Sequence, residues 1–315
     1  MSSKAQYTIG KHFRIYTDNL LGEGSFGKVY LGKDLYTNQL KAVKTESKKN
    51  NIHLLQTESN VINYVNQQIN DNPVIRNYWY GSDSKNNYLV TDLLGSTVES
   101  LLKKSGGKFQ LKTVLMLAEQ MIDRIKYYHN RNIIHRDIKP DNFLLELDKP
   151  KQNIYLIDFG LAKKYRKNST KKHIPYSEDK PHIGTARYMS VNAHEKKEQS
   201  RRDDMYSIGY VILYMLLGKL PWQGINERTK KERYKKIHKI KKLTTNEELV
   251  KNFRCRDCRN CYAQVCMKKY FDYLDTCAFD SEINYNFLIN EILICMEKHD
   301  YAYDYKWDWE SDDSE

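Results

Sequence analysis

Two short blocks in the middle of the chain carry the residue types that a phosphoryl transfer requires. Residues 135–142 read His-Arg-Asp-Ile-Lys-Pro-Asp-Asn, and residues 157–160 read Ile-Asp-Phe-Gly after a β-like run. Catalysis of such a transfer consists of positioning the reactants and neutralising charge. Asp137 is the candidate that orients a hydroxyl nucleophile and accepts its proton late in the reaction. Lys139 is the candidate that reaches the transferred phosphate.

Two oxygen-bearing side chains of the same blocks are candidate metal ligands. A nucleoside triphosphate is used together with divalent cations, and these hard cations prefer oxygen ligands. Asp158 supplies a carboxylate and Asn142 supplies an amide oxygen. The two blocks together therefore predict a site for ATP and Mg²⁺.

A glycine-rich run near the start of the chain is a candidate phosphate-binding loop. Residues 22–27 read Gly-Glu-Gly-Ser-Phe-Gly. This pattern alone is weak, because dinucleotide-binding folds carry it in front of a helix. Here a β-like run follows, which favours a strand–turn–strand flap over the phosphates; a hairpin without a ligand is the alternative. The predicted nucleotide contacts in this flap are Leu21, Gly22, Glu23, Gly24, Ser25, Phe26, Gly27, Lys28 and Val29.

A lysine that ends the next β-like run is a further candidate phosphate contact. Lys44 closes the run Ala-Val-Lys, and a lysine in a half-buried strand needs a carboxylate partner to keep its charge. Glu58 lies in residues 54–69, where apolar side chains recur every three or four positions, as is typical of a helix. We expect Lys44 and Glu58 to form an ion pair; the alternative is two unrelated surface charges.

At these residues the chain resembles the eukaryotic protein kinases. The resemblance rests on the glycine run, Lys44, Glu58, residues 135–142 and residues 157–160. It implies a bilobal fold, with a small β-rich N-lobe that binds the nucleotide and a larger α-helical C-lobe. The lysine at position 139, two residues after the catalytic aspartate, resembles the serine/threonine kinases.

Further segments narrow the resemblance to the casein kinase I family. Most kinases carry Ala-Pro-Glu in the segment after Asp158, whereas residues 184–192 here read Gly-Thr-Ala-Arg-Tyr-Met-Ser-Val-Asn. The resemblance implies that Asp92 and Leu94 meet adenine with their backbone, and that Asp204 holds the catalytic-loop backbone. The other matching segments are residues 139–144, 173–176, 200–204, 220–224 and 304–309.

The hydrophobic pattern agrees with an α+β chain of two unequal lobes. The predicted strands are residues 19–21, 28–32, 40–44, 79–81 and 88–91, with one helix at residues 54–69 among them. The strongest helical segments are residues 111–128 and 204–217. The predicted division is residues 1–94 as the nucleotide-binding N-lobe, residues 95–300 as the C-lobe, and residues 301–315 as the domain end with a short acidic tail.

The chain carries a marked positive charge. It has 52 Lys and Arg against 40 Asp and Glu, a net charge of +12, which favours anionic partners without choosing among them. The casein kinase I resemblance implies acidic or phosphorylated protein substrates, with Arg187 as an anion-binding residue. Arg233 stands where that family usually has a lysine, and it is the second candidate for binding the anion. A second patch would comprise Arg136, Lys163 and Lys180. The alternative is that these side chains form ion pairs within the fold.

Four of the six cysteines are close together in the sequence. Cys255, Cys258, Cys261 and Cys266 could supply four thiolates to Zn²⁺. The run lacks the two separated cysteine pairs of familiar zinc modules, so the alternative is one buried helix face. A disulfide framework is not expected, because the chain shows no secretory signal.

Composition and pattern exclude some classes of protein and leave others open. The longest apolar stretch, residues 206–217, is shorter than the roughly 18 residues that a membrane span needs. We expect a protein of the cytoplasm, the nucleus or both. The alternatives to an active kinase are a pseudokinase scaffold and a basic nucleic-acid-binding protein, although the sequence shows no zinc-finger or RNA-recognition signature.

Overall fold

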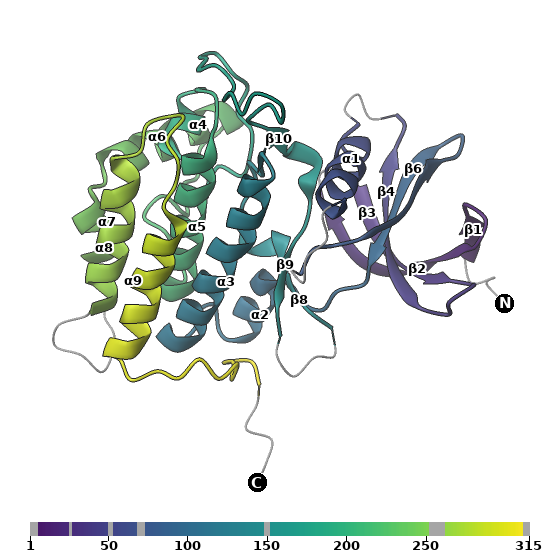
Figure 1. Cartoon of the computed structure of the whole chain (residues 1–315), viewed down its shortest axis with the longest axis horizontal. Coiled ribbons are helices and arrows are strands. Elements are labelled where there is room, and N and C mark those ends of the chain that lie inside the picture. The colour runs from purple at the N-terminus through teal and green to yellow at the C-terminus, as the bar shows by residue number, and fades with distance from the viewer. Residues whose placement is uncertain are drawn as a thin grey trace, which may run out of the picture.

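The computed structural model describes residues 6–24, 27–49, 53–67, 73–147, 152–251 and 262–310. The first part of this described chain forms an antiparallel sheet with the strand order β1-β2-β3-β4-β6-β5 (Figure 1). The strands are β1 (Gln6–Ile9), β2 (Phe13–Gly24), β3 (Gly27–Asp34), β4 (Leu40–Ser47), β5 (Asn77–Ser82) and β6 (Asn86–Asp92).

Strand β4 presents different residues to its two sides, because successive side chains of a strand point to opposite faces. Val43 is fully buried in a small apolar core that also contains Ile15 and Val90. Lys44 and Glu46 alternate with Val43 and Thr45 along the strand. Both contact the helix that follows the strand. One face of β4 thus stabilises the sheet, and the other face carries polar groups toward the helix.

Helix α1 (Leu55–Asn66) lies against the sheet. Its buried apolar residues Leu55, Ile62 and Val65 recur at helical spacing and form the stripe that packs inward. Glu58 lies on the same stripe and is only 4% exposed. Packing of the apolar residues therefore also turns the Glu58 carboxylate toward β4.

The rest of the described chain is mostly helical and packs around two long helices, α3 and α5, that lie in the middle of this part (Figure 1). Most side chains of both helices are buried, so the two helices form the centre of this part. The helices are α2 (Val98–Lys104), α3 (Leu111–Asn130), α4 (Val191–His194), α5 (Arg201–Leu217), α6 (Lys230–Leu243), α7 (Asn246–Lys251), α8 (Tyr262–Asp275) and α9 (Tyr285–Lys298).

Short elements between α3 and α4 hold the two chemical blocks of the sequence. They are β7 (Ile133–Ile134), the 3₁₀ turn η1 (Pro140–Asn142), β8 (Phe143–Leu145), β9 (Ile154–Leu156), the 3₁₀ turn η2 (Phe159–Leu161) and β10 (Lys163–Lys164). Strand β8 pairs with β9, and the N–H of Ile157 donates to the carbonyl of Asn142 over 3.0 Å. This pairing brings Asn142 and Asp158 to the same end of the hairpin.

The predicted α+β, two-part architecture is confirmed, with a β-rich first part and a helical remainder. Strand β1 and helices α7, α8 and α9 were not predicted. In the described part of the chain, no helix combines the length and the apolar content that a membrane span requires. The division at residue 94 and the intracellular location stay predictions.

Candidate active site

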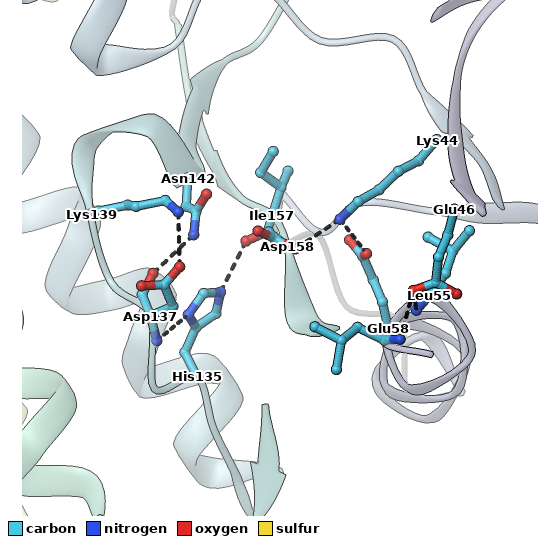
Figure 2. Close-up of polar contacts among 11 residues, drawn as sticks. Lys44, Glu46, Leu55, Glu58, His135, Asp137, Lys139, Asn142, Ile157 and Asp158 are labelled. Carbon is cyan, nitrogen blue, oxygen red and sulfur yellow. Dashed lines mark hydrogen bonds and ion pairs between the residues drawn. The ribbon is translucent and has the colours of Figure 1, made fainter. Parts of the chain in front are cut away.

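The side chain of Lys44 connects the sheet, helix α1 and the segment after β9. Its Nζ lies 2.6 Å from a carboxylate oxygen of Glu58 and 2.7 Å from Oδ1 of Asp158 (Figure 2). Burial by itself would lower the pKa of Lys44, but the two carboxylates outweigh it and hold this pKa above the usual value. The lysine therefore keeps its charge, as the sequence predicted from the need for a carboxylate partner.

Asp158 is placed by the backbone that follows β9. The residue has φ +67° and ψ +65°, a left-handed conformation that is uncommon for a residue other than glycine. Burial would raise the pKa of the Asp158 carboxyl, and the charge of Lys44 outweighs burial and lowers it. The carboxylate is thus kept ionised at neutral pH by a residue that is remote in the sequence.

The glycine run forms the end of β2 and the start of β3, as a strand–turn–strand flap requires. Gly27 cannot be replaced without strain, because a Cβ there would lie 1.9 Å from the carbonyl oxygen of Thr45 on β4. At Gly22 and Gly24 a Cβ would meet nothing within 4 Å, so these two glycines border open space. Ser25 and Phe26, also predicted as nucleotide contacts, lie outside the described residues.

The other predicted contacts in this flap flank the glycines. Leu21 is half exposed, and Glu23 and Lys28 face each other across the hairpin with 3.4 Å between Nζ and Oε1. Val29 lies opposite Lys44 in the register of β3 and β4. The flap and the lysine therefore belong to one continuous patch of sheet.

The catalytic block gathers around Asp137. Lys139 Nζ lies 2.8 Å from Oδ2 of Asp137, and the hydroxyl of Thr185 donates to Oδ1 over 2.7 Å. Asn142 donates its amide N–H to the backbone carbonyl of Asp137 over 2.9 Å (Figure 2). Thr185 was not predicted as a site residue. Its only sequence signal was its place directly after Gly184 in the segment that resembles casein kinase I.

A histidine couples this block to the Asp158 segment. The N–H of Asp137 donates to Nδ1 of His135 over 3.2 Å, so Nδ1 is the unprotonated nitrogen. Nε2 of the same ring donates to the carbonyl of Ile157 over 2.9 Å. His135 is completely buried, and it fixes the backbone of Asp137 relative to the residue that precedes Asp158.

Asp204 holds the same loop from helix α5, as the resemblance implied. Its carboxylate accepts the backbone N–H groups of His135 and Arg136 at 2.7 and 2.8 Å, and His129 Nε2 lies 2.9 Å away. Burial would raise the pKa of Asp204, but these hydrogen bonds and the neighbouring histidines lower it. Asp204 therefore acts on the loop backbone as a buried anion.

The residues predicted to meet adenine lie at the end of β6 and directly after it. Asp92 ends β6, and its carboxylate accepts the N–H of Arg76 at 2.8 Å and the hydroxyl of Tyr78 at 2.7 Å. The side chain of Asp92 is thus used to hold the strand β5 against β6. Leu94 packs on the apolar core of the helical part. The contact of this backbone with adenine stays a prediction.

Comparison with known protein families agrees with this geometry. A family model described as "protein kinase domain" matches residues 16–281 of the chain. The chain belongs to the protein kinase family. The glycine flap, Lys44, Glu58, Asp137 and Asp158 all lie within the matched range.

Two side chains of the kinase have oxygen atoms that suit Mg²⁺, the ion that protein kinases use together with ATP. Asp158 carries a carboxylate that is kept ionised, and the amide N–H of Asn142 is committed to the Asp137 carbonyl, which leaves the amide oxygen as the available ligand atom. Magnesium ions on nucleotides take one or two such oxygen ligands together with phosphate oxygens and water. Asp158 and Asn142 are the residues that would hold the ion.

The first predicted anion site of the kinase involves two arginines on different elements. The guanidinium of Arg187 lies 5.6 and 5.2 Å from the ring centroids of Tyr188 and Tyr214, and no carboxylate in the described chain is within ion-pair distance of it. Trp222 Nε1 donates to the Arg187 carbonyl over 2.7 Å. Arg233 is an exposed residue of α6.

The second predicted patch contains a carboxylate that sequence reasoning missed. Lys163 and Lys180 lie 2.8 and 3.5 Å from the same Oε2 atom of Glu198, while Arg136 donates its Nε–H to the carbonyl of Leu161 over 2.7 Å. Burial would raise the pKa of Glu198, but the two lysines outweigh it and lower this pKa. The patch therefore holds one internal negative charge, as the alternative of ion pairs within the fold anticipated.

The cysteine run of the kinase is only partly described. Cys255, Cys258 and Cys261 lie outside the described residues. Cys266 is buried in α8, and its thiol donates to the carbonyl of Glu291 in α9 over 3.3 Å. Among the described residues, no cluster of three or more His, Cys, Asp or Glu side chains has an arrangement that could hold a metal ion.

Proposed function

We propose that this chain is an active serine/threonine kinase of the casein kinase I type, which transfers the γ-phosphate of ATP to hydroxyl groups of acidic or phosphorylated proteins. The observation that carries the proposal is the double ion pair of Lys44 with Glu58 and Asp158, formed beside the Asp137–Lys139 pair. A pseudokinase scaffold has no need of this complete and charged set.

Each side chain of the set has a separate task in the transfer. Lys44 is charged and points at Asp158, so it holds the nucleotide phosphates next to the metal ligands. Asp137 orients the substrate hydroxyl and accepts its proton as the bond to phosphorus forms. Magnesium, when bound at Asp158 and Asn142, neutralises phosphate charge.

Lys139 supports the choice of serine and threonine as acceptors. Its ammonium group lies next to the Asp137 carboxylate, and that carboxylate outweighs the effect of burial and raises the pKa of Lys139. The cation is therefore available to the transferred phosphate when a short aliphatic hydroxyl approaches Asp137. Thr185 holds the second oxygen of Asp137 and keeps the carboxylate in one orientation.

Arg187 and Arg233 support the preference for acidic or phosphorylated substrates. Arg187 has no carboxylate partner within ion-pair distance in the described chain, and the Trp222 indole anchors its backbone. A guanidinium held in this way can bind a phosphate or carboxylate through two parallel hydrogen bonds. We assign a weaker anion-binding role to Arg136, Lys163 and Lys180, because a bound phosphate must compete there with Glu198.

Transfer of labelled phosphate to a small peptide panel tests the proposal. The peptides of the panel share one sequence and differ in two respects. The acceptor is a serine, a threonine or a tyrosine, and the residues before it are a phosphoserine, aspartates or neutral residues. We expect Mg²⁺-dependent labelling of the serine and threonine peptides, strongest with phosphoserine and weakest with the neutral sequence. Labelling of none of the peptides would support a pseudokinase, and equal labelling of charged and neutral peptides would contradict the anion-binding roles.

A further inference from the structure

Helix α1, which carries Glu58, does not cap its own N-terminus. The N-cap residue is Leu54, which has no side-chain oxygen to accept a hydrogen bond from the first turn. The first N–H groups of any helix lack partners within the helix, and an acceptor such as Ser, Thr, Asp or Asn commonly supplies them. The first turn of α1 therefore needs an acceptor from another element.

Glu46 of β4 supplies this acceptor. Its Oε1 accepts the backbone N–H of Leu54 over 2.7 Å and that of Leu55 over 3.2 Å, and Figure 2 shows the carboxylate directly at the start of the helix. A carboxylate at this end of a helix also interacts favourably with the helix dipole. Glu46 is 2% exposed, so water does not weaken the contact.

The carboxylate of Glu46 is itself held in place by the sheet. Asn87 lies directly opposite Glu46 in the register of β4 and β6, and its Nδ2 donates to Oε2 of Glu46 over 3.1 Å. Asn87 is 8% exposed. Both oxygens of Glu46 are therefore used, one toward the helix and one toward the neighbouring strand.

Glu46 and Lys44 form two attachments between the same strand and the same helix. Residues two apart in a strand point to the same face, so both side chains of β4 face α1. The N–H of Glu58 donates to the carbonyl of Leu54 over 3.0 Å, which places Glu58 one helical turn after the capped residue. The cap therefore determines where the first turn, and with it the Glu58 carboxylate, lies relative to Lys44.

We propose that Glu46 is a positioning residue for phosphoryl transfer, which keeps Glu58 within reach of Lys44 by capping α1. This inference rests on the proposed kinase function. Loss of the cap lets the first turn fray and moves Glu58 away from Lys44. Misplacement of a catalytic group by about 1 Å can reduce the rate by roughly a hundredfold.

The test compares Glu46→Ala and Glu46→Gln with a matched control, Asn284→Ala. Asn284 caps α9 by accepting the N–H of Phe287 over 3.0 Å, so its loss removes a helix cap outside the site. We expect Glu46→Ala to lower kcat by about ten- to a hundredfold. The glutamine variant keeps an acceptor oxygen and should lose only about two- to threefold. Asn284→Ala should keep the wild-type kcat.

A double-mutant cycle separates positioning from a general loss of stability. Glu46→Ala is measured in the wild type and in the Glu58→Ala background. If Glu46 acts through Glu58, the substitution should cost little further activity once Glu58 is absent. An equal loss in both backgrounds would overturn the proposal, as would a wild-type kcat in Glu46→Ala. If Glu46→Ala does not fold, Asn87→Ala replaces it in the same cycle, because Asn87 holds the Glu46 carboxylate. A wild-type kcat in Asn87→Ala, or an equal loss in both backgrounds, would then overturn the proposal.

Hydrogen exchange without nucleotide tests the cap independently of activity. We expect amides of α1 to exchange faster in Glu46→Ala than in the wild type or in Asn284→Ala. Unchanged exchange in α1 would overturn the proposed cap. Faster exchange in a protein whose wild type transfers no phosphate would instead refute the proposed function and leave the cap contact standing.

Discussion

Lys44 and Asp158 form a 2.7 Å ion pair although 114 positions separate them in the chain. The pair joins the sheet of the β-rich part to the β8–β9 hairpin of the helical part. Because Lys44 lowers the pKa of Asp158, the pairing stabilises the fold above the usual carboxyl pKa. This contribution is lost as the pH falls through the lowered pKa of Asp158.

Replacing Glu58 should impair transfer, because Lys44 loses one of its two carboxylate partners. We expect Glu58→Gln to lower kcat/KM for ATP by about a hundredfold, because the uncharged amide no longer holds Lys44 in place. The matched control is Glu291→Gln, which changes a buried carboxylate that pairs with Lys269 over 3.0 Å in the α8–α9 contact. Equal kinetic losses in the two variants would show that the effect is not specific to the site.

Asp204 should be needed for both stability and activity. In Asp204→Asn a single amide oxygen must replace two carboxylate oxygens, and the amide N–H₂ faces backbone donors of His135 or Arg136. We expect a loss of about 3–5 kcal/mol in the free energy of unfolding, measured with urea, and a kcat at least tenfold lower. A variant with wild-type stability and activity would contradict the role assigned to this buried anion.

Gly184 should tolerate no side chain. It has φ +102°, and a Cβ there would lie 2.5 Å from the carbonyl oxygen of Arg136. Gly184→Ala should push the following Thr185 away from Asp137, so we expect a kcat at least tenfold lower and a loss of about 2 kcal/mol or more in stability. Gly106→Ala is the control, since Gly106 also has positive φ (+75°) but no atom within 4 Å of its Cβ position. Its kcat should not change.

Mild acid should destabilise the fold through His194, which takes up a proton in the unfolded chain and not in the folded chain. Burial lowers the pKa of His194 to about 3. Below the unfolded-state pKa of about 6.5, the unfolded chain therefore takes up a proton that the folded chain does not. Stability should fall by up to about 1.4 kcal/mol per pH unit between these values. Urea unfolding at pH 7.5 and 5.5 should show that the free energy of unfolding falls less in His194→Gln than in the wild type. An equal fall in the two proteins would refute this role of His194.

The sequence was informative wherever a local pattern is sufficient. Strands β3, β4 and β6 follow from alternation, helices α1 and α3 from helical periodicity, and helix α5 from a long apolar run. The motif around Asp137 has a spacing that few other functions require. Lys44 and Glu58 could be paired in advance because a half-buried cation needs a partner.

Contacts between remote elements could not be predicted in the same way. Glu46 caps a helix from a neighbouring strand, and no signal near Leu54 indicates it. Glu198 reaches Lys163 and Lys180 only through the fold of the segment between them. Strand β1 and helix α7 are too short to show a periodic pattern. Helices α8 and α9 carry buried residues at helical spacing, and this signal was missed in the sequence.

The most direct test of the account measures nucleotide binding and phosphate transfer in Asp137→Asn and Asp158→Asn beside the wild type. With Mg²⁺ and labelled ATP, we predict that the wild type labels a phosphoserine-primed peptide and that both variants label it at least a hundredfold more slowly. Asp137→Asn should still bind ATP with wild-type affinity, because the proposed role of Asp137 is to orient the acceptor hydroxyl and not to bind the nucleotide. Wild-type transfer by either variant would contradict the assignment of these two aspartates to the active site.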